Sequence, residues 1–195
     1  MLIIQHRINT SAQLQQVPKE YGVELDVRSK GSQLIIHHEP FLGGENLEDW
    51  LQHYDHSFII FNVKEEGLED SITSLINKYK IKDFFFLDQS FPFLIKTSKT
   101  GEKRCAVRVS EFESLETALS LSSKINWVWI DYFTKFPLSS EDATKLKNAS
   151  FKLCLVSPEL QGYKDADVTH AVKAELQKKN IIIDAVCTKT PANWI

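Results

Sequence analysis

Residues 23–40 of the chain read Val-Glu-Leu-Asp-Val-Arg-Ser-Lys-Gly-Ser-Gln-Leu-Ile-Ile-His-His-Glu-Pro. Glu24 and Asp26 lie two positions apart in an apolar run, so in an extended strand the two carboxylates share one face. A polar turn follows, and a second apolar run ends in His37 and His38. Two acids on one strand are also what a solvated sheet face carries, so the rest of the chain has to decide between that interpretation and a functional site.

The composition is that of one ordinary globular domain. The chain has 195 residues, of which 43% are hydrophobic and 25% are charged, enough to bury a core. Its formal net charge of -3 argues against a nucleic-acid-binding surface. Cys105, Cys154 and Cys187 lie in or at the end of apolar runs, which predicts buried free thiols in a reducing compartment.

No targeting or membrane segment is predicted. The first residues become polar too soon for a signal peptide, and no apolar run approaches the roughly 20 residues needed to span a bilayer. We therefore expect a cytoplasmic protein with no stable membrane insertion. The sequence does not predict its oligomeric state.

Apolar runs alternate with helical or partly helical connections along the whole chain. The runs are continuous rather than alternating, which is typical of parallel strands buried on both faces. Eight such units predict an α/β fold, a compact (β/α)8 TIM barrel formed as a single domain by residues 1–195. An open doubly wound sheet is the alternative, although no Gly-rich phosphate loop follows the first strand. The predicted strands are 2–5, 23–27, 58–63, 83–87, 105–109, 127–130, 153–156 and 181–187.

Polar residues gather at the ends of these strands, where a barrel of this kind carries its active site. His6 and Arg7 end the first strand, and Asn62 and Lys64 end the third. Each of them alone is also compatible with a cap or a loop residue. Because several strand ends carry such residues at once, we expect them to form one site together with Glu24, Asp26 and His38.

In their order and spacing, these motifs resemble the glycerophosphodiester phosphodiesterases, which belong to the phosphatidylinositol-phospholipase-C-like phosphodiesterase superfamily. The pattern of that family is His-Arg, then Glu-x-Asp, then His-Asp, then Glu-x-Lys, and the resemblance runs through about residue 65. Weaker similarities to the family pattern occur at Ser90-Phe91 and in residues 184–191. The matching residues here are His6-Arg7, Glu24-x-Asp26, His38-Glu39 and Asn62-x-Lys64.

Several positions depart from the family pattern. Ile8 stands where the family has a glycine, and the insertion that carries its Pro-Glu-Asn-Thr segment is missing. Asn62 replaces the third carboxylate. An amide oxygen still binds a hard cation, but it brings no charge, so the affinity for a cation should be lower.

The resemblance implies a metal-dependent phosphodiesterase that acts on a small glycerol- or polyol-type phosphodiester. It implies that Glu24, Asp26 and Asn62 hold one divalent cation, Mg²⁺ or Ca²⁺, through oxygen ligands. It also implies that His6 and His38 are the catalytic acid–base pair. Arg7 and Lys64 would bind the substrate phosphate.

Two other functions stay open at this point. The same residues could stop at a cyclic phosphate, which would make the protein a lyase. Alternatively, the barrel could have lost catalysis and bind a phosphorylated metabolite or a protein partner, an interpretation that Asn62 and the missing insertion favour. His6, His38, Glu24, Asp26 and Lys64 favour an enzyme.

Overall fold

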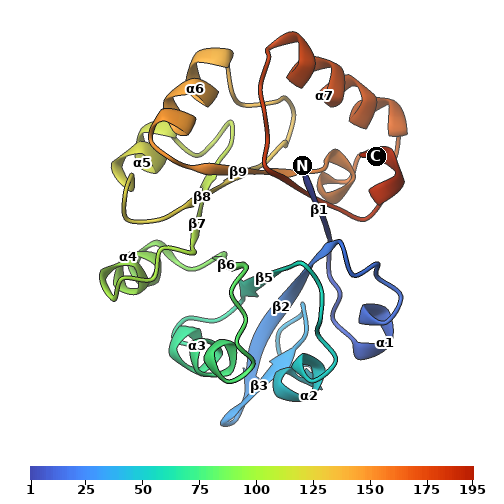
Figure 1. The fold of residues 1–195 in the computed structure, drawn as a ribbon, viewed down its shortest axis with the longest axis vertical. Coiled ribbons are helices and arrows are strands. Elements are labelled where there is room, and N and C mark those ends of the chain that lie inside the picture. The colour runs from blue at the N-terminus through green and yellow to red at the C-terminus, as the bar shows by residue number, and fades with distance from the viewer. The chain divides into compact units, whose positions relative to one another are not determined.

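The computed structural model describes residues 1–195 and divides them into two compact units (Figure 1). Residues 4–102 form the N-terminal unit, and residues 1–3 and 103–195 form the C-terminal unit. The first strand, β1 (Leu2–Gln5), contributes its first two residues to the C-terminal unit and its last two to the N-terminal unit.

The N-terminal unit alternates strands and helices after β1. Its further strands are β2 (Gly22–Lys30), β3 (Gln33–Ile36), β4 (Glu45–Asn46), β5 (Phe58–Val63) and β6 (Phe84–Leu87). Its helices are α1 (Ser11–Leu14), α2 (Leu47–Leu51), α3 (Glu69–Lys78) and α4 (Phe91–Lys99).

Strand β2 is the centre of the sheet in this unit. It pairs in parallel with β1 on one side and with β5 on the other, and β5 pairs in parallel with β6. Beyond Val27 the strand continues as an antiparallel hairpin with β3, which in turn pairs with β4. The carboxyl ends of β1, β2, β5 and β6 therefore meet at one edge of the sheet.

Burial explains why these runs form strands. Every residue of β5 and β6 is buried, and four phenylalanines, Phe61, Phe84, Phe85 and Phe86, are almost completely shielded from solvent. Strands that are apolar on both faces need cover on both, which is why helical segments with one buried face lie between them. In α3 the buried apolar face is formed by Ile72 and Ile76.

The C-terminal unit repeats the pattern. Its strands are β7 (Ala106–Val109), β8 (Trp127–Ile130), β9 (Lys152–Val156) and β10 (Ala185–Thr188). They pair in parallel in the order β7-β8-β9-β10, and the start of β1 lies beside β10, where Leu2 N–H donates to the carbonyl of Asp184 at 2.8 Å. The helical segments are α5 (Leu115–Ser120), α6 (Ser140–Asn148), α7 (Ala166–Lys178) and two short 3₁₀ turns, Pro158–Gln161 and Pro191–Asn193.

The expectation of an α/β fold built from parallel strands and helices is confirmed, with differences in detail. The last strand begins at Ala185 rather than at residue 181, because Ile182 is exposed and Asp184 binds neighbouring backbone groups. A helical or partly helical connection was predicted after the strand at 83–87 without bounds, and it is helix α4. The hairpin strand β4 was not predicted, because it has only two residues. The pairing of β6 with β7, which would close a barrel, stays a prediction, as does the single domain.

The three cysteines are buried and unpaired, as predicted. Complete burial raises the pKa of the Cys154 thiol well above its ordinary value, so this thiol stays neutral. None of the helices has the length and apolar character that crossing a membrane requires.

Gly44 is required by the close approach of two backbone segments. A Cβ atom at this position would lie 2.0 Å from the carbonyl oxygen of Ile36, whereas one at Gly43 would meet only the Lys30 ammonium at 3.8 Å. We expect Gly44→Ala to lower the free energy of unfolding by about 1–3 kcal/mol, because backbone must move. Urea denaturation measures this, with Gly43→Ala as the matched control. Equal stability of the two variants would contradict the assignment.

Candidate functional site

Strands β2 and β5 bring three oxygen-bearing side chains together. Glu24 and Asp26 lie on one face of β2, and Asn62 on β5 is the direct strand partner of Asp26. The Asn62 amide Nδ2 donates to Glu24 Oε1 at 2.8 Å. Both carboxylates are completely buried, and Asn62 is 5% exposed. The sheet register therefore fixes this triplet without any contribution from loops.

Burial has a clear electrostatic effect on Glu24. Loss of solvent and the negative charge of Asp26 raise the pKa of the Glu24 carboxyl from 4.5 to about 7. The hydrogen bonds from Asn62 and from the Arg7 backbone, and the Lys64 ammonium, act in the opposite direction. A buried carboxylate pair of this kind is unstable without a compensating cation.

The segment after β1 folds back onto these carboxylates. Arg7 adopts a left-handed backbone conformation with φ of 55°, and its N–H donates to Glu24 Oε2 at 2.7 Å. Asn9 binds Asp26 twice: its Nδ2 donates to Asp26 Oδ2 at 2.8 Å, and its Oδ1 accepts from Asp26 N–H at 3.0 Å. The chain holds Arg7 in this uncommon conformation through contacts on both sides of it.

His38 lies between a cation and an anion. The Arg7 guanidinium contacts His38 Nε2, and Glu39 Oε1 lies 2.6 Å from His38 Nδ1. Because a guanidinium can only donate, Nε2 is the acceptor, and the neutral ring carries its proton on Nδ1 and donates it to Glu39. This hydrogen bond lowers the pKa of the Glu39 carboxyl.

His6 and Lys64 complete the cluster. His6 Nε2 lies 3.7 Å from Glu24 Oε2. The Lys64 ammonium lies 3.3 Å from Asp26 Oδ1 and 3.4 Å from Asp88 Oδ2. The Arg7 guanidinium Nε lies 3.8 Å from Asp26 Oδ2. The seven predicted site residues thus form one connected group at the carboxyl edge of the N-terminal sheet, namely His6, Arg7, Glu24, Asp26, His38, Asn62 and Lys64.

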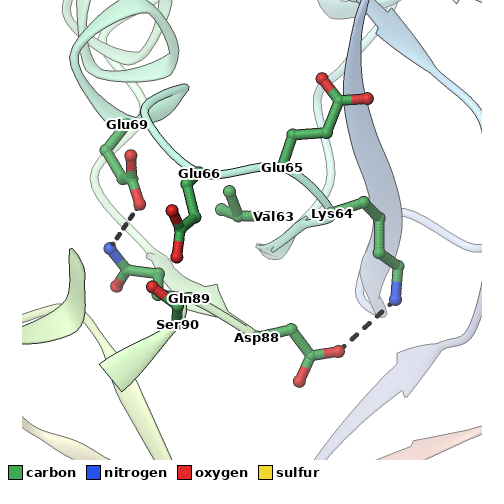
Figure 2. Close-up of a pocket in the computed structure, with 8 residues that line it drawn as sticks. All are labelled: Val63, Lys64, Glu65, Glu66, Glu69, Asp88, Gln89 and Ser90. Carbon is green, nitrogen blue, oxygen red and sulfur yellow. Dashed lines mark hydrogen bonds and ion pairs between the residues drawn. The ribbon is translucent and has the colours of Figure 1, made fainter. Parts of the chain in front are cut away.

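A small pocket opens beside Lys64 (Figure 2). It has a volume of about 200 Å³ and lies between the loops that follow β5 and β6. The Lys64 and Asp88 side chains point toward one another at its rim, and Gln89 donates to Glu69 on the opposite side (Figure 2). The lining is rich in hydrogen-bond acceptors, namely the carboxylates of Glu65, Glu66, Glu69 and Asp88 and the polar groups of Gln89 and Ser90.

The triplet fits a hard divalent cation by the chemistry of its donors. Two carboxylates and an amide supply only oxygen, which Mg²⁺ and Ca²⁺ prefer. Asp26 Oδ1 and Asn62 Oδ1 are both buried and accept no hydrogen bond. No group of three acidic, histidine or cysteine side chains that could hold a metal ion occurs in the structure, so a cation at this triplet would have two carboxylates and the Asn62 amide as its protein ligands.

Three residues in contact with the site were not among the predicted ones. Asn9 binds Asp26, Glu39 binds His38, and Asp88 binds Lys64. Glu39 follows His38 directly, so its place beside the motif is a signal that could have been used. Asn9 reaches Asp26 through a turn whose conformation the sequence does not reveal.

The raised pKa of Glu24 predicts how stability depends on pH. An acid with a higher pKa in the folded state binds protons more tightly there, so stability falls as the pH rises from 4.5 through about 7. In EDTA, we expect Glu24→Gln to remove this fall and to be about 2–3 kcal/mol more stable than the native protein at pH 8. Urea denaturation between pH 4 and 8 measures it. The exposed Glu20→Gln should keep the native profile; a native profile in Glu24→Gln would refute the prediction.

Comparison with known proteins agrees with this architecture. The sequence matches no family profile and no curated protein. Solved structures that resemble the fold include a glycerophosphodiester phosphodiesterase from Agrobacterium tumefaciens, with a TM-score of 0.70, 16% identity and coverage of 100% of this chain and 98% of that one. They also include a glycerophosphoryl diester phosphodiesterase from Parabacteroides distasonis, with a TM-score of 0.66, 10% identity and coverage of 98% of this chain and 84% of that one. The chain therefore has the TIM-barrel-like α/β fold of these phosphodiesterase structures.

Proposed function

We propose that this chain is a metal-dependent phosphodiesterase that hydrolyses a glycerol- or polyol-type phosphodiester. One observation carries the proposal: a buried carboxylate pair, two imidazoles and two cations converge on one edge of the sheet. The fold shared with two glycerophosphodiester phosphodiesterases supports it independently.

Arg7 and Lys64 are the residues that would bind the substrate phosphate. Arg7 is partly exposed, so its guanidinium can turn from His38 toward a phosphoryl group and donate paired hydrogen bonds. Lys64 holds its ammonium between Asp26 and Asp88 at the rim of the pocket. A phosphodiester that binds there would meet the positive charges of both side chains.

The contacts of the two histidines suggest different roles. His38 Nε2 keeps its lone pair because Glu39 holds the ring proton on Nδ1, so His38 would accept the proton of the attacking hydroxyl. His6 is the second imidazole of the cluster and lies beside the Glu24 carboxyl, and it would give its proton to the departing alcohol. Attack by a neighbouring hydroxyl of the substrate forms a new P–O bond while the bond to the departing alcohol breaks, which leaves a cyclic phosphate. Water would then open one P–O bond of this cyclic ester and complete the hydrolysis.

Glu24, Asp26 and Asn62 would hold the divalent cation, Mg²⁺ or Ca²⁺, which as a Lewis acid would polarise a phosphoryl oxygen. The remaining task of the chain is to orient the alcohol portion of the substrate. The pocket beside Lys64 suits this part, since its carboxylates and amide can accept hydrogen bonds from the hydroxyl groups of glycerol or a similar polyol.

Asn62 also favours a second candidate, a barrel that binds a phosphorylated ligand without turning it over. With one carboxylate fewer than the related pattern, the cation site has less negative charge to attract its ion. Direct assay separates the two candidates, and analysis of the products separates a hydrolase from a lyase that releases a cyclic phosphate.

The assay uses a generic aryl phosphodiester and glycerophosphodiesters, with Mg²⁺, Ca²⁺ or EDTA. We expect turnover that requires the cation and that falls 10²- to 10⁴-fold in His6→Ala and His38→Ala, because each removes a proton-transfer group. Circular dichroism establishes that the variants are folded. Turnover that survives both substitutions, or no turnover of any diester by the folded native protein, would count against the proposed function.

The affinity for the cation tests the role of Asn62 separately from activity. Asn62→Asp keeps the shape of the side chain and adds the missing charge, so we expect it to bind Mg²⁺ or Ca²⁺ at least about tenfold more tightly in titration calorimetry. Asp26→Asn should weaken binding by a similar factor. If neither substitution changes the affinity, the cation does not bind at this triplet.

A further inference from the structure

Arg28 forms a partly buried network of hydrogen bonds that the proposed function does not yet use. It follows Asp26 by two positions on β2, so its side chain leaves the strand on the face that carries both site carboxylates. The side chain is only 14% exposed. An arginine that is buried to this extent needs partners that satisfy its donors.

The Arg28 guanidinium is bound on two sides. Its Nε and Nη2 donate to the carbonyl oxygen of His38 at 3.0 and 2.9 Å, and its Nη1 donates to Glu65 Oε1 at 3.3 Å. Because a guanidinium is planar and rigid, three donors on two acceptors define one orientation. Arg28 therefore joins the loop that carries His38 to the segment that follows β5.

Glu65 is also held by β2 without the help of Arg28. Its Oε2 accepts from the Ser29 N–H at 3.0 Å and from the Ser29 hydroxyl at 2.6 Å. Burial alone would raise the pKa of the Glu65 carboxyl, but the hydrogen bonds from Ser29 and Arg28 lower it, so the group is ionised at neutral pH. The strand thus holds Glu65 through Ser29 and the backbone of His38 through Arg28.

The contacts of the His38 ring are more exposed than this backbone contact. The side chain of Arg7 is 40% exposed and that of Glu39 is 63% exposed. Contacts between exposed charged side chains contribute little to order on their own. The position of the imidazole therefore depends on how firmly the backbone beneath it is held, and Arg28 provides a contact that does so.

Lys64, which would bind the substrate phosphate, does not depend on Arg28 in this way. Its backbone N–H donates to the Val27 carbonyl at 3.0 Å, and its ammonium lies 3.3 Å from Asp26 Oδ1. Loss of the Arg28 side chain would therefore free the backbone of His38 and leave Lys64 in place.

We propose that Arg28 is a positioning residue, which acts through the backbone of His38 and holds its imidazole where it can accept a proton during the reaction. This inference rests on the proposed function and adds to it a residue outside the motifs that resemble the family pattern. Removal of the guanidinium should slow the chemical step and leave the binding of the diester unchanged.

The kinetic test compares Arg28→Met with Lys30→Met, which removes a positive charge at an exposed position two residues further along β2. We expect kcat to fall about 10- to 100-fold in Arg28→Met, with KM within about threefold of the native value, because the proton acceptor moves while the phosphate site remains. Lys30→Met should keep both constants. In the His38→Ala background, Arg28→Met should lower kcat by less than about twofold further, since the residue through which it acts is gone.

Imidazole ¹⁵N NMR at pH 8 tests the same role without turnover. The native His38 ring should carry its proton on Nδ1, and in Arg28→Met its two nitrogen shifts should move toward the average of the two tautomers. His56, whose Nε2 lies 3.1 Å from the Val17 carbonyl, is the internal control and should not change. Arg28→Lys keeps the charge but lacks the planar fork, so it should show smaller changes in kcat and in the shifts, and it replaces Arg28→Met if that variant does not fold.

The possible failures can be told apart. A native kcat or native His38 shifts in the folded variant would overturn the inference and leave the phosphodiesterase in place. An equal fall in Lys30→Met, or an undiminished fall in the His38→Ala background, would overturn it as well, because Arg28 would then not act through His38. If the native protein cleaves no diester, the proposed function fails, and the ring shifts alone decide whether Arg28 positions His38: unchanged shifts refute this, and averaged shifts support it.

Discussion

The burial of two carboxylates on one strand is the constraint on which the rest of the N-terminal unit depends. Glu24 and Asp26 are completely shielded from solvent, and each needs compensation that the chain supplies from a different direction. The Arg7 backbone, Asn9 and Asn62 donate hydrogen bonds, while Lys64 and the Arg7 guanidinium bring positive charge. The left-handed turn at Arg7 and the register between β2 and β5 both serve this requirement, because they place the donors where the carboxylates are.

The hydrogen bonds and positive charges around Glu24 do not fully offset the burial of its negative charge. This uncompensated charge suits the site to its proposed function. Its raised pKa means that part of the protein carries a neutral carboxyl there near neutral pH, a state that a bound divalent cation would remove. A half-buried carboxylate in the C-terminal unit shows the opposite case. In the C-terminal unit, Glu159 accepts from the hydroxyls of Ser157 and Thr188 and from the Lys189 N–H, and these bonds lower its pKa. Such a carboxylate stabilises a strand end and needs no further partner.

The sequence was most informative where side-chain pattern and backbone geometry coincide. The continuous apolar runs predicted the parallel strands, and the two-residue spacing of Glu24 and Asp26 predicted their shared face, because both depend only on strand periodicity. The contacts made through turns were not predictable in this way. Asn9 reaches Asp26 and Glu39 reaches His38 only because loops bend at particular positions. The separation into two compact units gives no signal in composition.

The account as a whole depends on Glu24 and Asp26 being a carboxylate pair prepared for a cation. The most direct measurement is a ¹³C NMR titration of the Glu24 side-chain carboxyl, without divalent ions and then with saturating Mg²⁺ or Ca²⁺. We expect a pKa of about 7 for the Glu24 carboxyl without the ion and a pKa below the ordinary glutamate value with it, because the cation stabilises the ionised form. A pKa near 7 that neither ion changes would contradict the central claim, since the pair would then be a buried structural feature and not a metal site.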